Sequence, residues 1–227
     1  MQDMIECKSF FAAQLSPEEP YSAADAVAAM MGAARGSRWR QNEACDAVIA
    51  RGAVACVVSG AVRKFALRPS GQRQIVDFAF AGDYLGFAPA DPAFFVEAVS
   101  NDTRIISFTR ERIDSLAARF PAVAMLMRHG ADDTIRRLEH HLLVQSRITA
   151  REKVGAYLAA MSRRVSPNGA NAILLPITRY DIADHLGIAV ETVSRTMTML
   201  CRRGSIALKT ARDVEIRDPS MLSDDDF

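Results

Sequence analysis

The chain has 227 residues, of which 49% are apolar and 24% charged, and its formal net charge is +1. This balance is ordinary for one large or two modest globular domains, and it excludes a disordered chain or one drawn to nucleic acid by overall charge alone. The sequence contains no run of about eighteen apolar residues and no signal-like N-terminus, so we expect a cytoplasmic protein with no membrane partner. Its four cysteines lack metal-ligand spacing and predict free thiols, with no bound metal.

The N-terminal half changes character near residue 53. Residues 1–36 are a variable segment with one predicted helix over 23–34, and we assign them no function. Residues 37–115 carry short apolar runs separated by glycine turns, which is typical of a β-roll or barrel. The predicted strands cover residues 54–58, 62–67, 74–80 and 103–108.

A long helical stretch follows, and we treat residues 116–146 as one helical segment that begins properly at Pro121. Ala131, Ile135, Leu138 and Leu142 recur at alternating steps of four and three residues, and Gln145 continues the series. This is the spacing of a seam that packs against another helix. The seam faces either its own domain or the same helix of a second subunit.

Residues 147–227 predict a helix over 150–164, then two helices joined by a tight turn at Gly187, then a small hairpin. Thr178 can accept a backbone N–H at the start of the first of these two helices while Asp181 reaches back to it. Gly204 suits the position after the second helix. The inward sides are predicted from apolar residues at helical spacing: Ile182, Ala183 and Leu186 in the first helix, and Val193, Met197 and Leu200 in the second. The pattern is that of a winged helix-turn-helix.

The outward face of the second helix holds Glu191, Ser194 and Arg195, which stand side by side at i, i+3 and i+4. In a major groove, Arg can grip guanine O6 and N7 together, and Glu can accept from the cytosine amino group. Alone, the triplet would favour an ordinary solvated Glu–Arg pair. Within a helix-turn-helix, and with basic residues concentrated between 147 and 217, it predicts a sequence-specific DNA contact.

This region resembles the DNA-binding motif of the CRP/FNR superfamily, and Glu191-Thr-Val-Ser194-Arg195 matches the E-x-x-S-R of its FNR and FixK branch. The resemblance covers roughly residues 53–217. It implies an α+β fold: an N-terminal cyclic-nucleotide-binding-type β-roll, a long dimerisation helix and a C-terminal winged helix-turn-helix. It also implies a transcription regulator, an activator rather than an enzyme, that binds double-stranded DNA as a homodimer and contacts RNA polymerase.

The resemblance implies a TTGA–TCAA type palindrome, read by Glu191, Ser194 and Arg195, and a FixK-like role in oxygen-limitation or nitrogen-oxide responses. Because dimer symmetry must match operator symmetry, we favour the subunit-pairing interpretation of the seam. Lys209 and Arg212, at the hairpin tip, are either phosphate contacts or solubilising turn residues. The full set of candidate phosphate contacts is Thr178, Arg179, Thr192, Lys209 and Arg212.

The sensory half departs from its liganded relatives. The family's cyclic-nucleotide site uses a Glu in the turn equivalent to residues 82–86 and then an Arg-Ser or Arg-Thr pair. Here Asp83-Tyr84 stands in that turn, and Glu97 lies in the apolar stretch where the Arg belongs and would repel a cyclic phosphate. We therefore expect no cyclic nucleotide. Residues 38–45 do not match the family's opening strand and turn, which predicts an incomplete or rearranged barrel.

Other cofactors are judged from the cysteines and histidines. An iron–sulfur cluster needs several thiolates, and the N-terminal region offers only Cys7, so we expect no cofactor of that kind. His140 and His141 point about 100° apart on a helix and are interpreted as solvated. A ligand- or haem-gated sensor of the same superfamily is the alternative function. Cys201 is either a packing residue or a redox-sensitive thiol beside Arg202 and Arg203.

Overall fold

The computed structural model describes residues 11, 23–46, 52–88, 93–165, 172–174, 177–210, 213–218 and 222. The chain divides into two compact units. The first contains residues 1–65 and 78–137, and the second contains residues 66–77 and 138–227. Among the helices described, none is both long and apolar enough to span a membrane.

Two β-sheets hold the strands of the first unit, and the facing ends of β3 and β4, within residues 66–77, belong to the second unit. The four-stranded sheet has the order β1 (Arg35–Trp39), β7 (Thr103–Phe108), β2 (Val54–Ser59) and β5 (Tyr84–Leu85). The three-stranded sheet has the order β4 (Arg73–Phe80), β3 (Ala61–Leu67) and β6 (Phe94–Ala98). Small and β-branched side chains from both sheets form one buried cluster: Cys45, Ala55, Val57, Val62, Ala79, Leu85, Val96, Ala98 and Ile105. Alternation along each strand places these residues on one face, as a β-roll requires.

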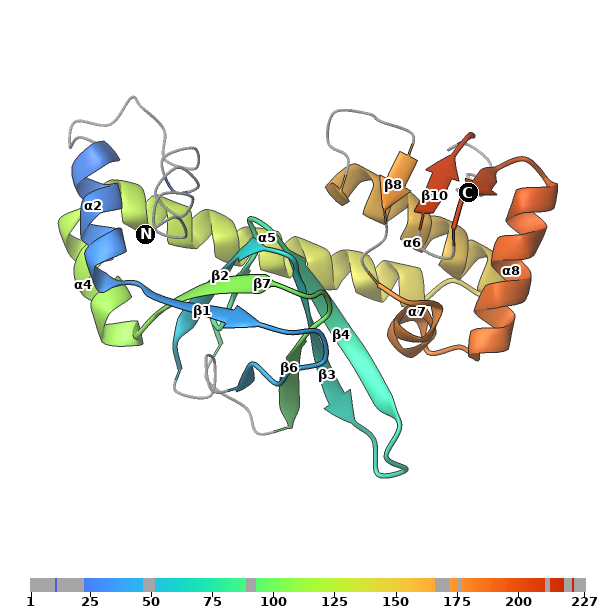
Figure 1. Cartoon of the computed structure of the whole chain (residues 1–227), viewed down its shortest axis with the longest axis horizontal. Coiled ribbons are helices and arrows are strands. Elements are labelled where there is room, and N and C mark those ends of the chain that lie inside the picture. The colour runs from blue at the N-terminus through green and yellow to red at the C-terminus, as the bar shows by residue number, and fades with distance from the viewer. Residues whose placement is uncertain are drawn as a thin grey trace. The chain divides into compact units, whose positions relative to one another are not determined.

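Helices complete the first unit. They are α2 (Ala23–Ala33), α4 (Arg110–Arg119) and the first part of α5 (Pro121–Gln145), which Figure 1 shows as one uninterrupted helix; its residues from Leu138 on belong to the second unit. Pro121 stands in the first turn of α5, where its missing N–H costs nothing. A second cluster joins the helices to the strands β2 and β7, and includes Val27, Met30, Cys56, Ile106, Phe108, Ile113, Val123 and Leu126.

The four predicted strands are confirmed, but three strands were not predicted. The strand β1 lies alongside β7, from Arg35 opposite Ser107 to Trp39 opposite Thr103, so a strand precedes β2 where the sequence predicted none (Figure 1). Its sequence, Arg-Gly-Ser-Arg-Trp, lacks apolar alternation because β1 is an edge strand and mostly exposed. The strands β5 and β6 lie in the region interpreted only as an effector segment.

The second unit contains α6 (Ala150–Val165), α7 (Arg179–Leu186), α8 (Val190–Arg202) and a small sheet of order β8 (Ala172–Leu174), β10 (Asp213–Ile216) and β9 (Ile206–Leu208). The predicted helices and hairpin are confirmed, and β8 adds a third strand. The residues that the periodicity marked as inward are buried: Ile182, Ala183, Leu186, Val193, Met197 and Leu200. The fold is α+β, with a β-sheet domain, a long helix and a winged helix-turn-helix.

Candidate nucleic-acid interface

Helix α7 begins with a complete capping box. The Thr178 hydroxyl accepts from the Asp181 backbone N–H at 3.1 Å, and Asp181 Oδ2 accepts from the Thr178 N–H at 3.0 Å and from its hydroxyl at 2.7 Å. Gly187 ends the helix with φ at +65°, a left-handed conformation that glycine adopts without strain. The start of α7, with Thr178 and Arg179, is therefore held in a defined place.

The rotation of α8 about its axis is set by its buried side. Val193 and Met197 are fully buried, and Leu200 is 1% exposed. The side chains at i−2 and i+2 from Val193 must then face outward, and Glu191 and Arg195 are indeed exposed, with Ser194 half-buried between them. The three residues that we predicted to read bases lie together on the solvent side of the helix.

Glu191 and Arg195 are not tied to each other. Arg195 Nη2 lies 3.5 Å from the Thr192 hydroxyl, and among the described residues no ion pair joins it to Glu191. The ordinary interpretation of the triplet, a solvated Glu–Arg pair, is thus not the conformation found. Both charged groups remain available to a partner outside the chain.

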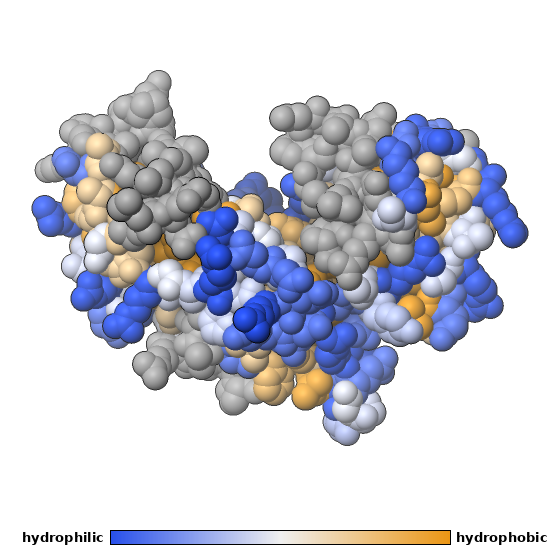
Figure 2. All heavy atoms as spheres, in the orientation of Figure 1, coloured by the Kyte–Doolittle hydropathy of each residue, from blue (hydrophilic) through white to orange (hydrophobic). Residues whose placement is uncertain are grey.

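The same face extends farther along the helix than we predicted. A surface hollow of about 410 Å³ is lined by Ser194, Arg195, Thr198, Met199 and Arg202. Figure 2 shows hydrophilic and apolar residues mixed over α8. Thr198 and Arg202 were missed, although their spacing of seven and eleven from Glu191 keeps them on the face that carries it.

The predicted phosphate contacts lie on several elements: Thr178 and Arg179 at the start of α7, Thr192 on α8 and Lys209 after β9. In the described part of the chain Arg179 forms no ion pair, and the N-terminal turn of α8 has no side-chain cap because Ala189 precedes it. Its free backbone N–H groups are the kind that bind phosphate. Lys209 approaches Glu215 to 3.9 Å, an exposed pair of little strength. Arg212 lies outside the described residues.

The α5 seam is uncovered in the single chain. Ile135 is 54% exposed, Leu138 39% and Leu142 67%, while Ala131 is half-buried. Contiguous apolar side chains in water are unfavourable, and they commonly mark a surface that another molecule covers. The three largest seam side chains therefore belong to no core in the described part of the chain.

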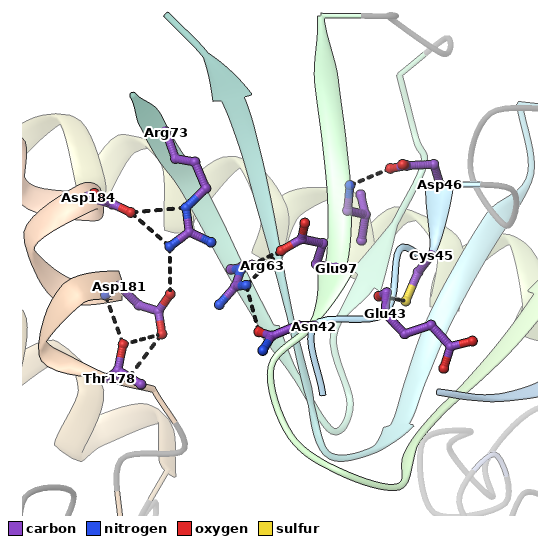
Figure 3. Close-up of polar contacts among 11 residues, drawn as sticks. Asn42, Glu43, Cys45, Asp46, Arg63, Arg73, Glu97, Thr178, Asp181 and Asp184 are labelled. Carbon is purple, nitrogen blue, oxygen red and sulfur yellow. Dashed lines mark hydrogen bonds and ion pairs between the residues drawn. The ribbon is translucent and has the colours of Figure 1, made fainter. Parts of the chain in front are cut away.

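Acidic side chains in the effector region are already paired within the first unit. Glu97 Oε2 accepts from Arg63 Nη2 at 2.6 Å and from its Nε at 3.0 Å, and Arg63 also donates to Asn42 Oδ1 at 2.9 Å (Figure 3). The Asp83 carboxylate pairs with Arg137 at 3.1 Å and accepts from the Phe80 backbone N–H at 2.7 Å. The sequence did not predict Arg63 or Arg137 in these roles.

One interpretation of the histidines is wrong. The ring of His141 is not solvated but stacks on that of His185, with centroids 3.9 Å apart, and Tyr157 meets His185 edge-on at 5.5 Å. Burial lowers the pKa of His185 to about 3 and lowers the pKa of His141. Helical spacing alone does not show which other segment covers a side chain, so the sequence did not indicate that His141 is shielded from solvent.

The thiols are separate from one another. Cys45 and Cys56 are buried and Cys201 is partly exposed; all three are free. Burial raises the pKa of the Cys45 thiol to about 12, which keeps it protonated and unreactive. No group of three or more His, Cys, Asp or Glu side chains suited to a metal ion occurs within the residues that the structure describes. Cys7 lies outside them.

Together, the capped α7, the outward polar face of α8 and the small β-sheet define a winged helix-turn-helix DNA-binding protein. Residues 152–224 match the Crp-like helix-turn-helix domain family. The chain is 37% identical over 167 residues to the nitrogen fixation regulation protein FixK of Rhizobium meliloti, covering 73% of this chain and 74% of that protein. Against FixK of Azorhizobium caulinodans it is 38% identical over 170 residues, covering 73% and 68%.

The fold agrees with these sequence relationships. The solved structure of FixK2 from Bradyrhizobium japonicum superposes with a TM-score of 0.74 at 31% identity, and the match covers 83% of this chain and 95% of that one. The protein belongs to the CRP/FNR family of DNA-binding transcription regulators, which are not enzymes, and it is FixK-like.

Proposed function

We propose that this protein is a homodimeric transcription activator that binds a TTGA–TCAA type palindrome, contacts RNA polymerase and acts in the cytoplasm in oxygen-limitation or nitrogen-oxide responses. The observation that carries the proposal is the outward face of α8, where Glu191 and Arg195 are exposed and not paired with each other. The operator type and the physiological setting are proposed from the resemblance of the E-x-x-S-R pattern to the FNR and FixK branch, and the similarity to two FixK proteins supports that branch.

In the proposed complex, α8 enters the major groove by its N-terminal half. The Arg195 guanidinium then donates to O6 and N7 of a guanine, while the Glu191 carboxylate accepts from the amino group of a cytosine. Ser194, between them, contacts the outer bases. Each bidentate contact discriminates against a wrong base by about 1–3 kcal/mol.

Phosphate contacts would hold this helix in register. Thr178 and Arg179 at the start of α7, Thr192 on α8, and the wing residues Lys209 and Arg212 are the proposed contacts. Such contacts carry no sequence information themselves, but they fix where the reading helix sits on the duplex. They also make binding strongly dependent on salt, because each one releases condensed counterions.

The dimer follows from the exposed apolar seam of α5. Ile135, Leu138 and Leu142 would pair with the same residues of a second subunit, which removes apolar surface from water. A two-fold axis along the seam matches the two halves of a palindrome.

We further propose that operator binding needs no cyclic nucleotide. Glu97 is neutralised by Arg63, and Asp83 by Arg137, so the acidic groups of the effector region already have partners. A cyclic phosphate entering beside Glu97 would have to displace Arg63, whose side chain is 7% exposed. The alternative, gating by a ligand or haem, would be revealed by a Soret absorbance band or by an operator affinity that depends on an added ligand.

The proposal is tested with Arg195→Ala. We expect a loss of about 1–3 kcal/mol on a palindromic duplex and little change on a scrambled one, because the lost contact reads a base. Fluorescence anisotropy on both duplexes measures this. Arg112→Ala, which removes an exposed arginine from α4, is the control for charge alone and should leave both affinities unchanged. Equal losses on the two duplexes from Arg195→Ala would refute a base-reading role.

A further inference from the structure

The second unit contains a segment outside the Crp-like helix-turn-helix match. Residues 66–77, the facing ends of the strands β3 and β4, belong to the same compact unit as α7 and α8. Three successive residues of β4, Arg73, Gln74 and Ile75, each contact α7. Figure 3 shows the contacts of Arg73. A segment 111 positions away in the sequence thus contacts α7, the helix that begins the DNA-binding motif.

Arg73 holds two carboxylates of α7. Its Nε and Nη2 lie 3.2 Å and 3.0 Å from Asp184 Oδ2, and its Nη2 lies 3.7 Å from Asp181 Oδ1. The side chains of Asp181 and Asp184 are only 2% and 21% exposed, so the attraction is less screened than at a free surface. Two acids three residues apart on one helix face repel each other, and the shared guanidinium removes that repulsion.

One of these acids is the capping carboxylate. Asp181 presents Oδ2 to the backbone N–H and hydroxyl of Thr178, and Oδ1 to Arg73. Arg73 is therefore linked to the first residues of α7 through a single, nearly buried carboxylate, that of Asp181. Those first residues are Thr178 and Arg179, which we propose as phosphate contacts.

The other end of α7 is held by the neighbours of Arg73. The Gln74 side-chain amide donates to the carbonyls of Asp184 at 2.9 Å and His185 at 3.4 Å. These carbonyls belong to the last turn, where no helical partner exists. The Ile75 carbonyl lies 3.1 Å from Nδ1 of the buried His185. The strand thus contacts α7 at both ends, and Gln145 of α5 also donates to the His185 carbonyl.

We propose that Arg73 is a positioning residue for operator binding: through Asp181 and Asp184 it fixes α7, so that the phosphate contacts at the start of α7 and the base contacts on α8 engage DNA together. This rests on the operator-binding role proposed above. Arg73 itself touches no DNA in this account. Its loss reduces selective affinity by loosening α7, because phosphate contacts that are out of place no longer hold α8 in register.

The test compares Arg73→Ala and Arg73→Lys with Arg38→Ala. Arg38 is a matched control, since it too is a strand arginine paired with an aspartate, Asp102, at 3.1 Å, but both side chains are more than half exposed. Operator affinity is measured by anisotropy on the palindromic and scrambled duplexes over a range of salt concentrations. We expect Arg73→Ala to weaken palindrome binding about tenfold, Arg73→Lys to recover part of it, and Arg38→Ala to match the wild type.

Two further readouts separate positioning from other roles. A direct phosphate contact by Arg73 would be lost equally on the palindromic and the scrambled duplex, whereas loss of positioning should weaken mainly palindrome binding, for which α8 must be held in register. Amide hydrogen exchange, measured without DNA, should accelerate over residues 178–187 and not in the first unit. A double variant with Asp184→Asn should lose less on adding Arg73→Ala than the wild type does.

The outcomes are distinguishable. Wild-type affinity in Arg73→Ala, an equal loss of affinity on both duplexes, or unchanged exchange over 178–187 would each overturn the positioning role. If the wild-type protein fails to select the palindrome but exchange in Arg73→Ala accelerates as expected, the operator assignment fails while the contact that fixes α7 stands. If Arg73→Ala unfolds in the assay, Arg73→Lys and Asp184→Asn carry the same comparison with milder changes.

Discussion

At the scale of single residues, the predictable contacts were the local ones. The Thr178–Asp181 capping box spans three residues and was predicted, because both partners and their spacing are visible in the sequence. The contacts of Arg73 with Asp184 and of Arg63 with Glu97 join residues 111 and 34 positions apart. No sequence pattern identifies such distant residues as partners. Only the folded structure shows that the charges of the effector region and of α7 are neutralised.

The buried His185 gives a pH dependence. Its pKa is lowered to about 3, first by burial and then by the charges of His141, Arg164 and His140, against about 6.5 in an unfolded chain. The unfolded state therefore binds the extra proton, and stability present above about pH 6.5 is lost as the pH falls toward 3. One such group contributes a slope of at most about 1.4 kcal/mol per pH unit.

This is measured by urea unfolding at pH 7, 6 and 5. We expect the free energy of unfolding of the wild type to fall with acidity, and His185→Phe to be less stable at pH 7 but flatter in its pH profile, because the titrating group is gone. His129→Gln, which alters an exposed histidine of α5, should retain the wild-type profile. An unchanged slope in His185→Phe would show that other groups govern acid stability.

At the scale of elements, whether a helix or strand could be predicted from the sequence depended on how much of it is buried. The helices α5 and α8 and the β9–β10 hairpin were predicted because an apolar stripe or alternation marks their inward side. The edge strand β1 has almost no buried side chain and gave no such signal. The predicted β-roll was therefore correct in its central strands and incomplete at its margin.

The seam of α5 leads to a prediction about assembly. Leu142 is 67% exposed, so Leu142→Asp should leave the subunit folded while placing a charge in the proposed dimer interface. Sedimentation velocity should show a shift to monomer, and operator affinity should fall about 100-fold or more as the two half-sites become independent. Leu67→Asp, at a 51% exposed site outside the seam, is the control. A Leu142→Asp protein that sediments like the wild type would place the dimer interface elsewhere.

At the scale of the whole molecule, the sequence supported the family and the fold class because the most specific pattern, E-x-x-S-R on a helix-turn-helix, is local and charged. The sensory half was harder to interpret. Its function depends on whether acidic groups face a ligand or one another, and the pairs Glu97–Arg63 and Asp83–Arg137 become apparent only when distant strands and helices are brought together.

The central claim is selective operator binding without an effector. The most direct measurement is fluorescence anisotropy of the untreated protein on a TTGAT–ATCAA duplex and a scrambled duplex, together with its absorbance spectrum, then with reductant, peroxide and cAMP. We predict tight, selective binding to the palindromic duplex by colourless protein, unaffected by cAMP. A loss of binding in peroxide would indicate that oxidation of Cys201 matters. Selective binding that appears only after a ligand is added would contradict this account and make the β-roll a working sensor.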